Sequence, residues 1–334
     1  MGADRLTLAI GSGLLAIPAS GRILVMGPGA GTDISALPRD RVLAVQPFRP
    51  DHDALAARGI AATPALPAEA FAAAVVFLPR SREAARDWIA RAAAAVARGG
   101  PVAVDGQKTD GIDGLLRDLG VRVALSEPVV KAHGRLAVFA AGRDLSDWRS
   151  GLRKARGGFD TRPGVFSADG PDPGSSLLAD ALPARLPGRG LDLGAGWGFL
   201  ARAALAREGV TALDLVEADA EALDCARANI TDPRAAFHWA DARCFRPESP
   251  ADWVVANPPF HSGRATDPAL GAAFIGAAAR MLTPEGTLWL VANRPLPYDR
   301  VLAASFREVE DIGGNAAFRL TRAARPLPRP KGTA

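Results

Sequence analysis

The sequence is poor in the side chains that build metal sites and disulfide frameworks. Its 334 residues include only two cysteines and four histidines. Cys225 and Cys244 form no Cys-x-x-Cys pair, so the sequence predicts neither a disulfide nor a zinc framework and fits a reducing cytoplasm. The histidines are scattered along the chain, so we expect no bound metal.

Long apolar runs are also missing. No stretch approaches the roughly 18 residues that a membrane helix needs, and the N-terminus lacks the basic and apolar regions of a signal peptide. We therefore expect a cytoplasmic protein without membrane attachment. We also expect a monomer. Apolar residues make up 48% of the chain and charged residues only 23%, so it can bury sizeable cores.

The formal net charge is only +4, but basic residues gather in two places. They are a mid-chain cluster and a C-terminal tail: Arg149, Arg153, Lys154, Arg156 and Arg162, and Arg319, Arg322, Arg325, Arg329 and Lys331. Charge alone favours a solvated linker and a frayed tail. Clustered cations can also bind the phosphates of a nucleic acid.

The mid-chain stretch 148–164, "WRSGLRKARGGFDTRPG", breaks the apolar periodicity and is rich in Gly and Arg. It predicts a domain boundary there, giving domains 1–150 and 151–334. On both sides, strand-like runs alternate with Ala-rich helical runs. This rhythm predicts an α/β fold in which helices cover a parallel sheet.

In the second half, the periodicity predicts an ordered series of elements. The expected helices are 199–208, 220–230 and 268–282, and the expected strands are 190–193, 212–218, 235–241, 252–257 and 286–293, with two more near Val309 and in 316–323.

The first half repeats this scheme. "GRILVMGPGAG" (21–31) aligns without a gap with "GRGLDLGAGWG" (188–198), so three glycines coincide and Val25 stands where the second copy has Asp192. "VVFLPRS" (75–81) aligns with "VVANPPF" (254–260), which puts Leu78 at the position of Asn257. The first half is therefore predicted to be a copy of the fold that has lost its polar site groups.

Polar groups end successive strands of the second half. Asp192 lies in an apolar strand and precedes Gly194, Gly196 and Gly198 in a turn that opens a helix, a pattern typical of a nucleotide site. Glu217 ends the second strand, where an acid can accept both ribose hydroxyls, and Asp241 ends the third, where it can meet an adenine amine. Alternatively, Asp241 closes a turn, and Asp219 and Glu221 cap the following helix.

This set resembles the class I S-adenosylmethionine-dependent methyltransferases. The resemblance implies two tandem Rossmann-like domains, each with a mostly parallel seven-stranded sheet flanked by helices, and S-adenosylmethionine as cofactor. Its implied cofactor-binding residues are Asp192, Gly194, Ala195, Gly196, Gly198, Glu217, Ala218, Asp241, Ala242 and Asn257.

The fourth strand runs into "NPPF", and these four residues are the predicted catalytic group: Asn257, Pro258, Pro259 and Phe260. A nucleobase amine is a poor nucleophile and needs acceptors that hold its N–H groups and stabilise the positive charge of transfer. The Asn257 amide and the Pro258 carbonyl supply such oxygens, and the following prolines restrict where they point. Phe260 offers a face on which a base can stack.

The chain is also similar to the ribosomal RNA small-subunit methyltransferase C family, which methylates the guanine N2 amine of 16S rRNA. The similarity rests on "RPGVFSADGPDPGSSLLADAL" (162–182), "NPPFHSG" (257–263), "LWLVANRPLPY" (288–298) and "HGRLAVF" (133–139). It implies ribosomal RNA or the small subunit as partner and a first domain without catalysis that serves RNA recognition or structure. It also implies substrate contacts from Phe260, His261, Phe166 and Ser175, with Asp172 as a further lid residue. Alternatively, Ser175 caps a helix and Phe166 lies in the core. Trp197 and the basic tail depart from the family pattern.

Other functions remain open at this point. The same motif type serves methylation of adenine N6, of guanine in large-subunit rRNA and of protein glutamine. An RNA-binding assembly protein without catalysis is a further alternative, and a nicotinamide oxidoreductase is a distant one.

Overall fold

The computed structural model describes residues 4–259, 261–262 and 265–328. Its contacts divide the chain into two compact units, Met1–Gly151 with Arg162–Gly164, and Leu152–Thr161 with Val165–Ala334. The division is therefore not a single cut, because a short segment beyond residue 150 packs with the first unit. None of the helices described is long and apolar enough to cross a membrane.

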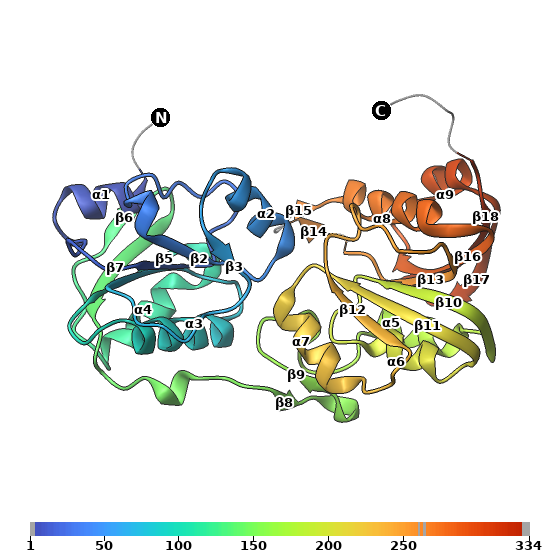
Figure 1. The fold of residues 1–334 in the computed structure, drawn as a ribbon, viewed down its shortest axis with the longest axis horizontal. Coiled ribbons are helices and arrows are strands. Elements are labelled where there is room, and N and C mark those ends of the chain that lie inside the picture. The colour runs from blue at the N-terminus through green and yellow to red at the C-terminus, as the bar shows by residue number, and fades with distance from the viewer. Residues whose placement is uncertain (1–3, 260, 263–264, 329–334) are drawn as a thin grey trace. The chain divides into compact units, whose positions relative to one another are not determined.

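The first unit is a sheet of strand order β3-β2-β1-β4-β5-β7-β6 with helices on both faces (Figure 1). Its strands are β1 (Ile23–Met26), β2 (Val42–Val45), β3 (Ala62–Thr63), β4 (Ala73–Phe77), β5 (Pro101–Gln107), β6 (Val129–Lys131) and β7 (Gly134–Ala140). Its helices are α1 (Arg5–Gly11), α2 (Arg49–Ala57), α3 (Arg82–Ala95) and α4 (Ile112–Gly120). The sheet is parallel except for β7, which is antiparallel to both β5 and β6.

The second unit repeats this topology strand for strand, in the order β12-β11-β10-β13-β16-β18-β17 (Figure 1). Its sheet strands are β10 (Arg185–Leu193), β11 (Glu208–Glu217), β12 (Ala235–Trp239), β13 (Ala251–Ala256), β16 (Leu282–Asn293), β17 (Phe306–Gly314) and β18 (Phe318–Pro326). Its helices are α5 (Pro173–Ala181), α6 (Phe199–Leu205), α7 (Ala220–Asn229), α8 (Pro268–Met281) and α9 (Asp299–Ser305). Two further pairs of short antiparallel strands lie outside the sheet. One is formed by β8 (Arg153–Lys154) and β9 (Asp160–Thr161), the other by β14 (His261–Ser262) and β15 (Ala265–Thr266). The predicted fold class is confirmed.

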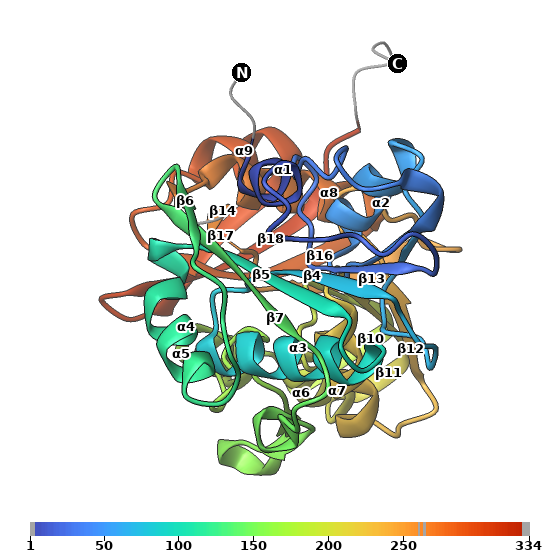
Figure 2. The same ribbon diagram turned by 90° about the vertical axis from the view of Figure 1, so that its left-hand side faces the viewer.

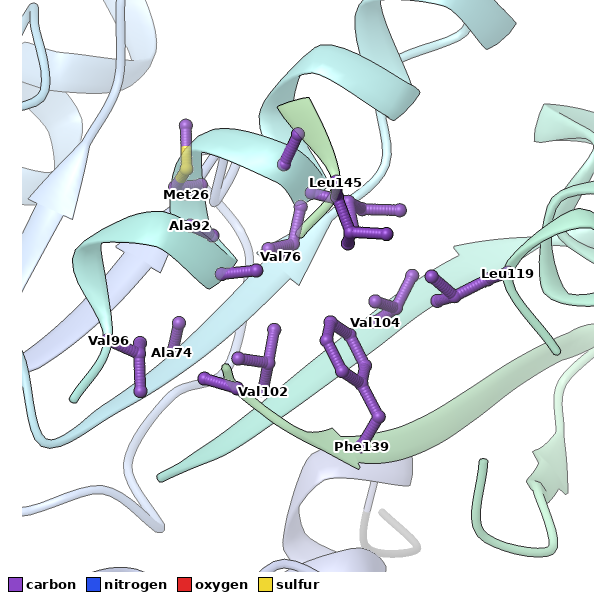
Figure 3. Close-up of a cluster of buried hydrophobic side chains, with 14 of the residues drawn as sticks. Met26, Ala74, Val76, Ala92, Val96, Val102, Val104, Leu119, Phe139 and Leu145 are labelled. Carbon is purple, nitrogen blue, oxygen red and sulfur yellow. The ribbon is translucent and has the colours of Figure 1, made fainter. Parts of the chain in front are cut away.

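Each sheet carries one core on each face, because side chains alternate along a strand. In the first unit α3 and α4 cover one face and α1 and α2 the other, as the turned view also shows (Figure 2). Figure 3 shows the α3 side, where Ala92 and Val96 lie over β4, and Phe139 of β7 lies beside Val102 of β5.

Several predicted boundaries were wrong by a few residues. The helix from Phe199 ends at Leu205, because β11 already begins at Glu208 and pairs there with Arg185. The third strand ends at Trp239, two residues before Asp241. The strand expected from Gly286 begins at Leu282, which pairs with Ala251.

The repeat itself has a register that differs from the sequence alignment in one place. Met26 pairs with Val76 in the first sheet, and its counterpart Leu193 pairs with Ala256 in the second. The equivalent of Asn257 is therefore Phe77 and not Leu78. The sequence alignment of 75–81 with 254–260 was wrong by one residue, because it placed Val75 and Val76 on the two valines at 254 and 255. In the sheets, Val76 is equivalent to Ala256, since the two residues pair with equivalent positions of the neighbouring strand.

Candidate active site

The glycine loop follows β10 and opens α6. Gly194, Gly196 and Gly198 all have positive φ angles, of 76°, 54° and 89°, a conformation that other residues rarely adopt. A side chain at Gly198 would press on Ile230 of the α7 segment, whereas the space beside Gly196 is open. The loop is thus packed closely at one end and open to a ligand in the middle.

Asp192 is fully buried in β10 on the α6 face of the sheet, between Leu215 and Val255. Neither of its carboxylate oxygens has a hydrogen-bond partner of good geometry in the described chain, although the Ala201 backbone N–H offsets part of its charge. Burial, followed by the charge of Glu217, raises the pKa of Asp192 to about 8. A buried carboxylate without a side-chain partner beside an open glycine loop suits a cationic ligand group, as the ammonium of S-adenosylmethionine is.

Glu217 ends β11, as predicted, and braces the glycine loop. One carboxylate oxygen accepts from the Gly196 N–H at 2.7 Å and the other from the Asp219 N–H at 2.8 Å. Burial raises the pKa of Glu217, and burial together with Glu217 and Glu221 raises that of Asp219 to about 7. The ribose role of Glu217 stays a prediction. Asp219 caps α7 by accepting the Glu221 N–H, which confirms the capping role predicted for Asp219 as the alternative.

Asp241 lies beyond the end of β12 and closes a turn. It accepts from the Arg243 N–H at 2.8 Å and pairs with the Arg243 guanidinium at 2.5 Å. Its neighbour Ala242 is buried, and the adjacent Ala218 accepts from the Trp239 indole at 2.9 Å. The predicted contact of Asp241 with adenine and the predicted cofactor contacts of Ala242 and Ala218 stay predictions.

Asn257 follows β13 directly and is held by two partners from the start of α5. Its Nδ2 donates to Asp172 Oδ2 and to Ser175 Oγ, both at 2.9 Å. Asp172 Oδ2 also accepts the Ser175 N–H at 2.8 Å and so caps α5. Both amide hydrogens are used within the chain, which leaves Oδ1 to accept from a substrate.

A cavity joins these groups to the glycine loop. It is lined by Phe166, Ser167, Asp172, Ser175, Gly194, Ala195, Gly196, Trp197, Phe199, Leu200 and Asn257. The structure thus brings together six of the predicted site residues: Phe166, Ser175, Gly194, Ala195, Gly196 and Asn257. Asp192, Gly198, Glu217 and Ala218 lie outside this lining, as do Asp241 and Ala242.

The rest of the predicted catalytic group is only partly described. Pro258 is buried and Pro259 is exposed. Phe260 lies outside the described residues, and only the backbone of His261 is placed, in β14 opposite Thr266.

Sequence reasoning missed the role of Trp197. Its indole is buried against Phe159 and Phe199, and its Nε1 donates to the Phe166 carbonyl at 2.9 Å. This bond ties the segment that carries the exposed Phe166 ring to the glycine loop. A lone tryptophan among glycines was the only signal for it in the sequence.

The first unit lacks each of these groups at the equivalent position. Val25 replaces Asp192, Phe77 replaces Asn257, and Gln46 follows β2 where Glu217 ends β11. The Gln46 side chain is hydrogen-bonded within the first unit: it donates to the Pro28 carbonyl and accepts from the Phe48 N–H. The Trp88 ring lies so close to Gly27 that a side chain there would overlap it.

Six of the described basic residues in the two clusters form ion pairs with acids of the chain. Arg149, Arg153 and Lys154 pair with Asp87, Asp169 and Asp160. On β18, Arg319, Arg322 and Arg325 pair with acids of β17 and its surroundings: Asp299, Asp311, Glu308, Glu310 and Glu285. These pairs count against a free phosphate grip by the described residues of both clusters. The frayed tail expected from Arg319 was wrong, because Arg319, Arg322 and Arg325 lie in β18 between β16 and β17. Arg329 and Lys331 lie outside the described residues. Within the described residues, no group of three or more His, Cys, Asp and Glu is arranged to hold a metal.

Known proteins resemble this chain over most of its length. The ribosomal RNA small subunit methyltransferase C of Idiomarina loihiensis is 27% identical over 91% of this chain and 94% of its own. The protein of that name in Klebsiella pneumoniae is 36% identical over 48% of each chain. The solved T. thermophilus 16S rRNA N2 methyltransferase, in complex with AdoMet and guanosine, matches with a TM-score of 0.79 and 26% identity over 92% of this chain and 89% of that one.

The methyltransferase small domain family model matches residues 156–322, half of the chain, and spans the glycine loop, the acids and the Asn-Pro-Pro segment described above. The chain belongs to the methyltransferase small domain family and is an S-adenosylmethionine-dependent methyltransferase.

Proposed function

We propose that this chain methylates the exocyclic N2 amine of a guanine in the RNA of the small ribosomal subunit. The observation that carries the proposal is the amide of Asn257, whose two hydrogens are bound within the chain and whose oxygen is left as an acceptor beside the glycine loop. The relatives named for small-subunit rRNA, and the T. thermophilus enzyme solved with guanosine, support this choice of acceptor.

The residues present fit the cofactor. Asp192 would hold its ammonium group, the loop from Gly194 to Gly198 would lie under it, and Glu217 would hold its ribose. When bound, S-adenosylmethionine supplies a methyl group on a positively charged sulfur, which becomes a neutral thioether once the methyl has left. The protein itself has to position the acceptor amine and stabilise the charge that the amine gains.

Asn257 Oδ1 and the Pro258 carbonyl are the proposed acceptors for the two N2 hydrogens. They turn the nitrogen lone pair away from the base ring, and the proton that leaves after transfer passes to water. The buried position of Pro258 limits how far its carbonyl can move. Phe166 and Phe260 are the proposed stacking faces for the base. We further propose that the enzyme acts in the cytoplasm, as a monomer and without a metal.

Nucleoside mass spectrometry of 16S rRNA from cells that lack the gene tests the proposed function. We expect one N2-methylguanine to be lost, restored by the wild-type gene and not restored by Asn257→Ala, because removal of one preorganised polar group costs about 10²-fold or more in kcat. Unchanged N2-methylguanine in 16S rRNA would contradict the proposal. Loss of N2-methylguanine from large-subunit rRNA, of N6-methyladenine from nucleic acid, or of methylated glutamine from a protein digest of the same cells would support one of the alternative acceptors.

A further inference from the structure

We propose that Asp172 is a positioning residue that acts through Asn257, both fixing the amide and strengthening its oxygen as an acceptor. The inference rests on the proposed function, since it assumes that an amine binds at Asn257 Oδ1. Asp172 itself need not touch the substrate.

The geometry places a carboxylate directly behind the amide. Asp172 Oδ2 accepts one Asn257 Nδ2 hydrogen and Ser175 Oγ the other, each at 2.9 Å. Because an amide has two hydrogens on one side and an oxygen on the other, these bonds settle its orientation. A flipped amide would set its oxygen against the Asp172 carboxylate, which is repulsive.

The two partners are themselves held rigidly. Asp172 accepts the Ser175 N–H at 2.8 Å, while its own backbone carbonyl accepts from the Ser176 N–H and hydroxyl, each at 2.9 Å. Ser175 is 7% exposed. The negative charge also lies at the N-terminus of the nine-residue helix α5, where the helix dipole stabilises it. The pair therefore does not have to reorganise during the reaction.

The charge of Asp172 has a chemical consequence at the far end of the amide. A hydrogen bond donated to a carboxylate polarises the donor, so electron density shifts toward Asn257 Oδ1. As the guanine nitrogen bonds to the methyl carbon, it gains positive charge until one N2 proton leaves to water. A more negative Oδ1 stabilises that charge more in the transition state than in the ground state.

Asp172→Asn separates this effect from folding. Asparagine is as good a helix cap as aspartate and can still accept from Asn257, but it carries no charge. Asp4→Asn is the matched control, because Asp4 caps α1 in the first unit through the Thr7 N–H and lies outside the site. We expect Asp172→Asn to lower kcat about 10-fold or more, with the Kd for S-adenosylmethionine and the KM for RNA changed less than about twofold. Its Tm should differ from that of the wild type by no more than the Tm of Asp4→Asn does. Wild-type kcat in Asp172→Asn would overturn the proposal, as would equal losses in kcat and cofactor affinity, which indicate a purely structural role.

A charge exchange sharpens the test. Asn257→Asp sets two carboxylates side by side, which forces them to share a proton and removes the two Nδ2–H bonds that fix the orientation of residue 257. In the double variant Asp172→Asn with Asn257→Asp, the carboxylate faces the amine and the new amide donates to it. We expect its kcat to exceed that of Asn257→Asp by about 10-fold or more; a double variant no better than Asn257→Asp overturns the inference.

A third measurement needs no substrate. The chain has only four asparagines, Asn229, Asn257, Asn293 and Asn315, so asparagine-selective ¹⁵N labelling gives four pairs of side-chain amide signals. The Asn257 pair, identified by its loss in Asn257→Asp, should exchange slowly with water in the wild type and faster in Ser175→Ala. Exchange as fast as that of an exposed amide would show that Asp172 and Ser175 do not hold the Asn257 amide, and would overturn the inference. If the amide exchanges slowly but the protein does not methylate rRNA, the hydrogen bonds of Asn257 to Asp172 and Ser175 are supported and the proposed function is refuted.

Discussion

At the scale of single residues, Asp192 is the position where stability and function oppose each other. An aspartate in an unfolded chain ionises near pH 3.9, whereas burial raises the pKa of Asp192 to about 8 in the folded protein. Between these values the folded state holds a proton that the unfolded state has lost, so this group makes folding less favourable as pH rises from about 4 to about 8. A bound cation reverses the preference, because it favours the ionised form.

The affinity for S-adenosylmethionine is therefore expected to rise with pH between about 6 and 8, as Asp192 loses its proton. Titration calorimetry at pH 7 in two buffers with different ionisation enthalpies should show proton release on binding. Asp192→Asn is the control: it should lose cofactor binding and yet have a higher Tm than the wild type at pH 8, by about 2 °C or more, with no gain at pH 4. A pH-independent Kd would contradict this account of the site.

At the scale of elements, much of the second half could be read from its periodicity. The helix 220–230 and the strand 252–257 each lie within one residue of the observed element. What failed depended on partners distant in the chain. Asp172 and Asn257 are 85 residues apart, so no local pattern predicts their bond. The equivalence of Phe77 and Asn257 appears only in the sheet register, because a one-residue shift between two apolar strands leaves their composition almost unchanged.

The hydrogen bond from the Trp197 indole to the Phe166 carbonyl, called here the Trp197 tether, is a second long-range contact that can be tested. Trp197→Phe keeps the aromatic packing on Phe159 but removes the bond to the Phe166 carbonyl, which is worth about 1 kcal/mol. We expect faster amide hydrogen exchange in residues 165–170 and a KM for RNA raised severalfold, with kcat changed little. Trp253→Phe is the matched control, since the Trp253 indole is buried and its N–H has no acceptor in the described chain. Equal exchange in 165–170 for both variants would argue against a tether.

At the scale of the whole molecule, two units share one topology and only one carries the polar groups of the site. The first unit keeps the sheet order and the positive φ of Gly27. Its equivalents of the site residues are either apolar, as Val25 and Phe77 are, or hydrogen-bonded within the unit, as Gln46 is. We propose that the first unit serves RNA recognition, and such a role does not require a second cofactor. This division also explains how residues at the β1 and β4 ends could diverge without loss of the fold, since Val25 and Phe77 join the core there.

The full-length chain is accordingly expected to bind one S-adenosylmethionine, and restoring the acid of the first unit should not create a second site. In Val25→Asp the new carboxylate would be buried among apolar side chains without a partner, which costs several kcal/mol, and Trp88 would still lie against Gly27. Titration calorimetry should give a stoichiometry near one for both the wild type and Val25→Asp, with a markedly lower Tm for the variant, while the full chain with Asp192→Asn should bind none. A stoichiometry near two in the wild type, or binding that survives Asp192→Asn, would place a working site in the first unit and refute its loss of cofactor binding.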